Sequence, residues 1–178
     1  MKPKALLIAV IGVTLANASA FAQALNLPDR ETPRPETTTG IPHKQIGVEA
    51  IPELSEELVR RVAKLSGVTV GPTRISLPGA TGFQFKDNLS LERPEAIVGG
   101  REFAHVHPDG SLHAALEPAT AKAAVKAGWA TPHPWSTRNP NWSGFVMIYT
   151  PKSEVELEVV YKLVQNAYTY VSGNSPTE

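Results

Sequence analysis

The chain lacks several features that would point to familiar classes of protein. It has no cysteine, so neither disulfides nor thiolate metal ligands hold it together, and its hydrophobic core must do so. Lysine plus arginine equals aspartate plus glutamate, at 17 each, which excludes the basic footprint of a nucleic-acid-binding protein. A nucleophile elbow, a phosphate-binding loop, an HExxH motif and a dinucleotide fingerprint are also missing, so serine-hydrolase and nucleotide chemistry have no support.

Residues 1–22 have the pattern of a secretory signal peptide. Lys2 and Lys4 precede an apolar run over residues 5–15, and small-x-small cleavage sites end at Ala20 and Ala22. The apolar run is too short for a transmembrane helix, which argues against the alternative of an uncleaved anchor. We therefore expect export to a periplasm or the medium, with no stable membrane anchor after cleavage.

The remaining sequence predicts a tether, one domain and a tail. Residues 23–45 are rich in proline and threonine and predict a flexible tether with little to bury. Residues 46–173 predict one domain, since about 130 residues can build a sufficient core. Residues 174–178 predict a flexible tail.

Apolar periodicity within the domain predicts three helices and several short strands. The helices are expected over residues 55–66, from Pro118 to just before Gly128, and from Ser153 to about residue 171. Strands are expected near residues 68–70, 74–76, 83–85 and 145–149, and residues 129–142 are expected to form a loop. Because strands and helices do not alternate regularly, the sequence predicts an α+β fold: a small antiparallel sheet with a histidine-bearing hairpin, packed against two to three helices.

That hairpin holds three of the chain's five histidines: His105, His107 and His113. The intervening Pro108-Asp109-Gly110 fits a three-residue turn with glycine at the left-handed position. His105 then faces His113, and all three imidazoles lie on one face. A two-residue turn would mix imidazoles with apolar side chains, so the three-residue turn is favoured.

Alternation along the hairpin separates two predicted faces. The histidine face carries Arg101, Phe103, His105, His107, Ser111, His113, Ala115 and Glu117. The core face carries Ala104, Val106, Leu112, Ala114 and Leu116.

Three neutral imidazoles on adjacent strands have two possible uses. They can hold a divalent metal such as zinc, iron, copper or manganese, with His105, His107 and His113 as the ligands. Without metal, they can move protons, since like charges keep at least one imidazole neutral as a base. His133, in the expected loop, is a fourth candidate for either use. A solvated surface of histidines is the non-functional alternative.

Other side chains suggest how a ligand is held. Arg101 shares the histidine face and can hold an anionic or enolate oxygen, whereas Glu102 is expected to point to the other side. Aromatic side chains are candidates for the walls of a pocket that binds a flat ligand; the alternative is that they only pack in the hydrophobic core. They are Phe83, Phe85, Trp129, Trp135 and Trp142.

An ordered set of short motifs resembles the luciferase domain of fungal bioluminescence, and the small bacterial proteins that share that domain. The motifs are Arg101-Glu102-x-Ala104-His105-x-His107, Leu112-His113-x-Ala115-Leu116, Lys126-x-Gly128-Trp129, His133-Pro134 and Tyr149-x-Pro151 before a Glu-rich helix. The resemblance covers about residues 97–173. It implies an enzyme that uses molecular oxygen as co-substrate, as fungal luciferases do when they oxidise a hydroxylated pyrone through a peroxide that loses carbon dioxide.

The resemblance also implies roles for individual residues. The implied catalytic residues are His105, His107, His113 and His133. The implied substrate-binding residues are Arg101, Glu102 and Trp129. The sequence thus predicts an exported oxidoreductase acting on a small aromatic or enolic compound, without extending to light emission. The alternative is a non-catalytic envelope module that binds a metal or an aromatic ligand.

Overall fold

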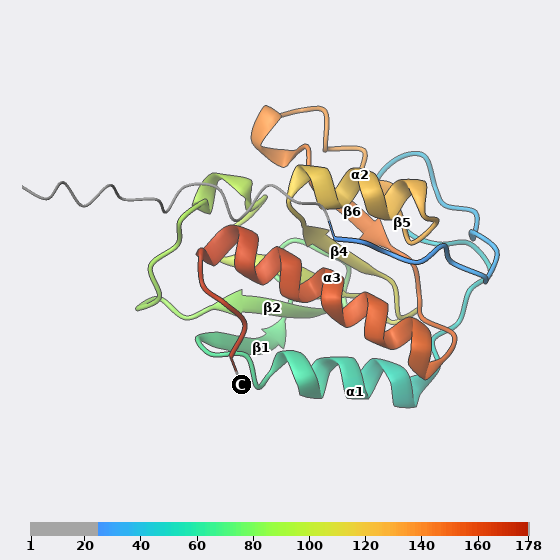
Figure 1. Cartoon of the computed structure of the whole chain (residues 1–178), viewed down its shortest axis with the longest axis horizontal. Coiled ribbons are helices and arrows are strands. Elements are labelled where there is room, and N and C mark those ends of the chain that lie inside the picture. Colours follow the sequence, from blue (N-terminus) through green and yellow to red (C-terminus); the bar gives the residue numbers. More distant parts are fainter. Residues whose placement is uncertain (1–24, 178) are drawn as a thin grey trace, which may run out of the picture.

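The computed structural model describes residues 25–177, so the predicted signal peptide lies outside the described residues. Over this range one antiparallel sheet has the strand order β1-β2-β3-β4-β6-β5. Its strands are β1 (Val68–Pro72), β2 (Thr81–Phe85), β3 (Glu102–Val106), β4 (Leu112–Ala115), β5 (Ala130–Pro132) and β6 (Phe145–Ile148). The helices α1 (Pro52–Val62), α2 (Pro118–Lys126) and α3 (Glu154–Ser172) lie side by side over one face of this sheet (Figure 1). The predicted α+β class is confirmed.

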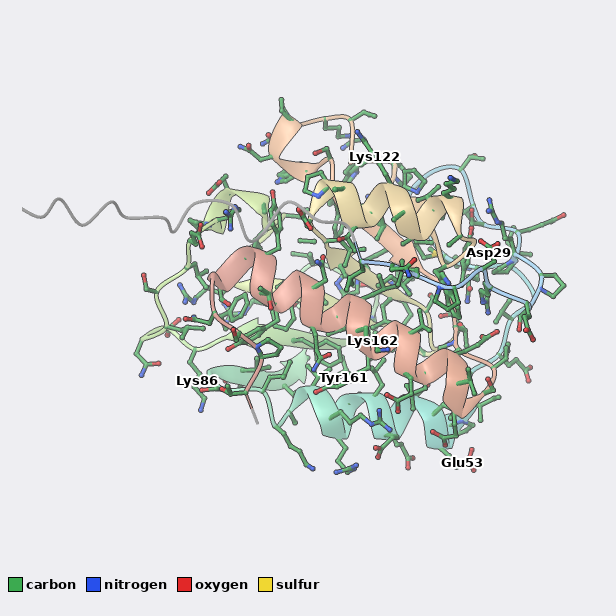
Figure 2. The ribbon with its side chains drawn as sticks, viewed as in Figure 1. Asp29, Glu53, Lys86, Lys122, Tyr161 and Lys162 are labelled. Atoms are coloured by element: carbon green, nitrogen blue, oxygen red, sulfur yellow. The ribbon has the colours of Figure 1, made fainter. Side chains whose placement is uncertain are left out.

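The helix α3 forms the centre of the helical layer. It packs on β3 and β4 and, along one side, on α1. Tyr161 lies between α3 and α1, whereas its neighbour Lys162 points to solvent (Figure 2). As predicted, Ser153 caps the first turn, and its hydroxyl accepts a hydrogen bond from the Glu156 N–H at 3.2 Å. The helix ends at Gly173, which has the left-handed φ of 75° that glycine adopts without strain.

The histidine hairpin has the predicted register. His105 pairs with His113 across β3 and β4. The His107 N–H donates to the Ser111 carbonyl at 2.8 Å, and Gly110 has a φ of +81°. The three-residue turn is therefore confirmed, and it places the three hairpin imidazoles on the sheet face that the helices leave uncovered.

A bulge in β3 changes which side chains share that face. Phe83 pairs with Ala104, but the next residue, Gln84, pairs with Glu102, so Phe103 is the extra residue. Phe103 therefore packs on the helix side, with its ring 6.2 Å from that of Tyr168. The prediction that Phe103 lies on the histidine face is wrong, and so is the prediction that Glu102 points away from it.

Two further local predictions are also wrong. Residues 74–76 form bends, not a strand, and curl over the histidine face. Within the expected loop 129–142, residues 130–132 form β5, which pairs with β6 at the edge of the sheet. An edge position tolerates Pro132, because the missing N–H faces away from the ladder.

The described part of the expected tether, residues 25–45, lies against the domain, and we call it the N-terminal strap. The Arg30 N–H donates to the Ala127 carbonyl at 2.8 Å, and the Trp129 indole donates to the Pro28 carbonyl at 2.6 Å. The Arg30 side chain is 2% exposed and pairs with Glu156 at 3.1 Å. The strap is thus part of the fold, because its polar groups find partners that local sequence does not show.

Near the other end of the chain, the Thr177 carbonyl accepts a hydrogen bond from the Ser66 N–H at 2.9 Å, so part of the expected tail also contacts the domain. None of the helices between residues 25 and 177 combines the length and apolarity needed to cross a membrane.

Candidate functional site: a buried histidine cluster

All five histidines of the chain meet on the sheet face opposite the helices. β3 supplies His105 and β4 supplies His113, while His107 follows β3, His133 follows β5, and the strap supplies His43. Each is at most 7% exposed. His113 lies at the centre, with its ring 4.5 to 5.3 Å from each of the other four imidazoles. The alternative of a solvated histidine face is therefore wrong.

A line of close polar contacts runs through the cluster. Nε2 of His105 lies 3.0 Å from Nδ1 of His113, and Nε2 of His113 lies 3.3 Å from Nδ1 of His43. At the inner end, Nδ1 of His105 lies 2.9 Å from Oε1 of Glu102. This last contact has ion-pair length but is not aligned as a hydrogen bond. The contacts thus connect the buried Glu102 carboxylate, through His105 and His113, with His43 at the surface of a cleft.

The Glu102 carboxylate is held firmly below the cluster. Its side chain is fully buried, Oε1 accepts from the Thr73 hydroxyl at 2.7 Å, and Oε2 accepts from the Arg74 N–H at 2.8 Å. Burial raises the pKa of Glu102, but His105 and these two donors outweigh it, so the net pKa is lowered. Glu102 is therefore ionised at neutral pH and can only accept hydrogen bonds.

Gly82 makes room for this carboxylate. It pairs with His105 across β2 and β3, and a Cβ atom at Gly82 would lie 2.6 Å from Oε2 of Glu102. The same atom would lie 3.1 Å from the Thr73 backbone. Any side chain at position 82 would thus displace the Glu102 carboxylate, which contacts His105 of the cluster.

Burial favours the neutral form of four of the imidazoles. It lowers the pKa of His113 well below its usual value, that of His133 to about 3 and that of His107 to about 4, with repulsion from neighbouring imidazoles adding to the effect. Burial also lowers the pKa of His43. Neutral imidazoles have a free lone pair, so at pH 7 the cluster can accept protons or bind metal.

The cluster opens into a cleft of about 190 Å³. The strap, residues 75–77 and the β5–β6 connection all contribute walls of the cleft. The strap and the bends that replace the expected strand at residues 74–76 therefore help to enclose the site. The lining residues are Ile41, Pro42, His43, Ile75, Ser76, Leu77, His107, His113, His133 and Trp135. His107, His113 and His133, predicted as site residues, lie in this lining.

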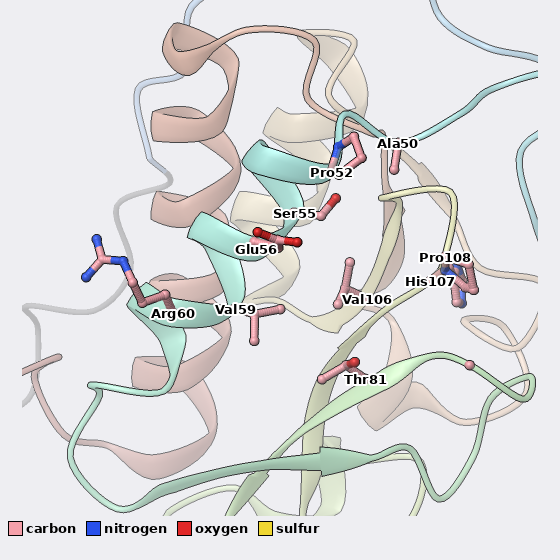
Figure 3. A pocket seen from close by; sticks show the side chains of 11 residues that line it. Ala50, Pro52, Ser55, Glu56, Val59, Arg60, Thr81, Val106, His107 and Pro108 are labelled. Carbon is pink, nitrogen blue, oxygen red and sulfur yellow. The ribbon is translucent and has the colours of Figure 1, made fainter.

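A larger hollow of about 540 Å³ lies on the other side of His107, between α1 and β3 (Figure 3). Ser55 and Val59 of α1 face Val106 and Thr81 across it. It contains no second cluster of histidines, since all five belong to the first.

Two of the predicted substrate-binding residues lie away from the cluster. The Arg101 guanidinium donates to the backbone carbonyls of Phe85, at 3.2 Å, and of Leu89, and so fixes the loop after β2. Trp129 stacks under Arg30, 5.8 Å from its guanidinium carbon, and lines a different hollow. Glu102 does join the cluster, but as a partner of His105.

The expected aromatic pocket is only partly formed. Trp135 lines the cleft, with its ring 5.3 Å from that of His133. Phe83 and Phe85 belong to the hydrophobic core, and Trp142 is half-buried away from the cleft lining.

His43 was missed because nothing near it in the sequence marks it. It lies 70 residues before His113, in a segment whose composition indicates a tether. The only available signal was that it is the one histidine left outside the predicted set.

Comparison with known proteins shows similarity to the luciferase-domain family. The family model for the luciferase domain matches residues 100–167. Luciferases of Armillaria gallica and Armillaria mellea are 26% and 28% identical over 169 and 172 residues, covering 84% of this chain. The chain spans 62% of the length of these relatives. No solved structure matches. The family match contains His105, His107, His113 and His133 but not His43.

Proposed function

The chain belongs to the luciferase-domain family, and from that premise we propose that it is an exported enzyme which uses molecular oxygen to oxidise a small enolic or aromatic compound of the hydroxypyrone type. The observation that carries the proposal is the convergence of five buried imidazoles, four of which line one cleft and stay neutral at pH 7. The relatives, which are named luciferases, support oxygen as the second substrate.

The first step is removal of a proton from the enol. A neutral imidazole facing the cleft, such as that of His43, can take this proton, a contribution typically worth about 10² to 10⁴ in rate. The enolate carbon then bonds to oxygen, and its electron pair reduces oxygen to a hydroperoxide. The proton held by the imidazole returns to the terminal peroxide oxygen, so substrate plus oxygen gives the hydroperoxide with nothing left over.

The cleft limits the size of the reacting group. Its volume of about 190 Å³ is below the roughly 300–1,000 Å³ of pockets that enclose drug-sized ligands. A single ring therefore fits better than a fused system. Ile75, Leu77 and Trp135 give the cleft apolar walls, which would limit the access of water and protect a peroxide from side reactions.

Oxygen uptake by the purified protein tests the proposal. A set of 3-hydroxy-2-pyrones should be consumed in a one-to-one ratio with oxygen. Turnover should fall at least about 100-fold in His43→Gln and in His113→Asn, with folding checked by circular dichroism. Lys162→Ala, on the exposed side of α3, is the matched control and should keep full turnover.

The alternative is a module that binds without catalysis, favoured by the fact that the same histidines form groups able to hold a metal ion. Stoichiometric binding of a hydroxypyrone with no oxygen uptake would refute the enzyme and support this alternative.

A further inference from the structure

We propose that His105, His107 and His113 bind one divalent transition-metal ion, through Nε2 of His105, Nε2 of His107 and Nδ1 of His113. One ring nitrogen from each of these residues lies within 4.8 Å of the others. His43, His113 and His133 meet the same distance test. Distance alone therefore does not choose between the two groups, but the hydrogen bonds around each ring do.

The tautomer of His107 is fixed by Ser111. The Ser111 hydroxyl has one hydrogen, which it donates to Oδ1 of Asp109 at 2.7 Å. Its oxygen must then accept from Nδ1–H of His107, 2.9 Å away. Nε2 of neutral His107 is therefore unprotonated, as a metal ligand requires.

The tautomer of His105 is fixed by Glu102. Both oxygens of the Glu102 carboxylate already accept hydrogen bonds, so an oxygen 2.9 Å from Nδ1 would repel a nitrogen lone pair; Nδ1 therefore carries the hydrogen and Nε2 is free to bind metal. In histidine metal sites the second ring nitrogen of a ligand usually contacts a carboxylate. Here Glu102 contacts His105 directly, and Asp109 contacts His107 through the Ser111 hydroxyl. Two rings of the group have this support.

His113 completes the site from the opposite strand. Its Nδ1 lies 3.0 Å from Nε2 of His105, so the two lone pairs can converge on one ion when Nδ1 is unprotonated. The hydrogen then sits on Nε2, which lies 3.3 Å from Nδ1 of His43 and can donate to it. His43 thus orients the ring of His113 by accepting this hydrogen bond.

The competing group is unsuitable because of His133. The backbone N–H of Trp135 donates to Nδ1 of His133 at 3.0 Å, so the lone pair of Nδ1 is already used. In the neutral ring the hydrogen is then on Nε2, which leaves no nitrogen for a metal.

The ligand set selects the class of ion. Three neutral imidazoles suit zinc, copper, iron, cobalt or nickel and disfavour magnesium and calcium, which require oxygen ligands. His107 and His113 also line the cleft, so a coordination position can face the substrate. When bound there, the ion would polarise an enol oxygen. Only this use in catalysis rests on the proposed function; the binding itself does not.

Metal titration of untagged protein, stripped with a chelator, tests the site. Zn²⁺ should bind one to one by calorimetry, and Co²⁺ should give the visible absorption of a nitrogen-ligated ion. His107→Ala should lower affinity at least about 100-fold, and Ser111→Ala, which keeps every ligand, about 10- to 100-fold. His133→Gln is the matched control, a substitution in the same cluster that should change metal affinity less than about threefold.

Two outcomes would overturn the site: an equal loss of affinity in His133→Gln and His107→Ala, or no stoichiometric Zn²⁺ binding by the folded protein. Oxygen measurements separate this inference from the proposed function. Stoichiometric metal without oxygen uptake would refute the enzyme and keep the site. Oxygen uptake by chelated protein that binds no Co²⁺ would refute the site and keep the enzyme.

Discussion

The paired glycines Gly71 and Gly82 offer a test of how the histidine cluster is supported. They lie opposite each other in β1 and β2 and differ only in what surrounds them. A Cβ atom at Gly71 would have no neighbour within 4 Å, whereas one at Gly82 would lie 2.6 Å from Oε2 of Glu102. We predict that Gly82→Ala strongly destabilises the protein and that Gly71→Ala does not.

The magnitude follows from the contacts that Glu102 would lose. Overpacking a strand interior costs about 1–3 kcal/mol. The carboxylate would also move from the Thr73 hydroxyl and the Arg74 N–H, and hydrogen bonds to charged groups are worth about 1.5–3 kcal/mol each. Since relaxation recovers part of this, we expect Gly82→Ala to cost about 2–4 kcal/mol. Gly71→Ala should be neutral or stabilise by up to about 1 kcal/mol, because alanine restricts the unfolded chain.

Urea denaturation at pH 7 measures both variants, and a double-mutant cycle identifies the cause. In a Glu102→Ala background the penalty of Gly82→Ala should shrink by more than about 1 kcal/mol, because the carboxylate that the new methyl group displaces is absent. Equal stability of Gly71→Ala and Gly82→Ala, or an unchanged penalty in the Glu102→Ala background, would refute this account of Gly82.

Two further predictions concern pH and the strap. Acid should destabilise the metal-free protein, because burial lowers the pKa of His107 to about 4 and that of His133 to about 3. In the unfolded chain the histidine pKa is near 6.5, so below that pH the unfolded chain binds more protons than the folded protein. The stability that these two histidines contribute is therefore complete above pH 6.5 and is lost as the pH falls towards 4 and 3. His107 alone accounts for up to about 3 kcal/mol, and urea titrations at pH 7 and 4.5 should show a smaller loss in His133→Gln than in wild type. Arg30→Ala should cost about 3–5 kcal/mol and speed proteolysis of the strap, because it leaves the Glu156 carboxylate without its buried partner. Arg34→Ala, which removes only an exposed hydrogen bond to the Lys126 carbonyl, should cost less than about 1 kcal/mol, and equal effects of the two arginine variants would contradict the buried-pair argument.

The hairpin could be predicted from sequence because local forces decide it. The Pro108-Asp109-Gly110 turn fixes the loop, and alternation of imidazole with apolar side chains selects one register, so His105 opposite His113 followed directly. The cap at Ser153 is equally local. Patterns of this kind depend on residues a few positions apart and need no knowledge of the tertiary fold.

The support of the site depends on contacts that sequence patterns do not show. The bulge at Phe103 brings Glu102 beneath the cluster, and the absence of a side chain at Gly82 in the neighbouring strand leaves room for its carboxylate. His43 reaches His113 from a strap held by distant partners, among them Thr150, whose hydroxyl accepts a hydrogen bond from Gln45 at 2.6 Å. Composition identified a segment rich in proline and threonine but not the partners that hold it.

The contacts of the strap also bear on the order in which the site forms during folding. Arg30 bonds to Thr150 and Glu156, which lie 120 and 126 residues later in the chain, whereas His105 and His113 are eight residues apart. Since contacts between distant residues form more slowly than local ones, we expect the hairpin histidines to come together before His43 joins them. An ion or small molecule would then reach the hairpin until docking of the strap completes the wall of the cleft.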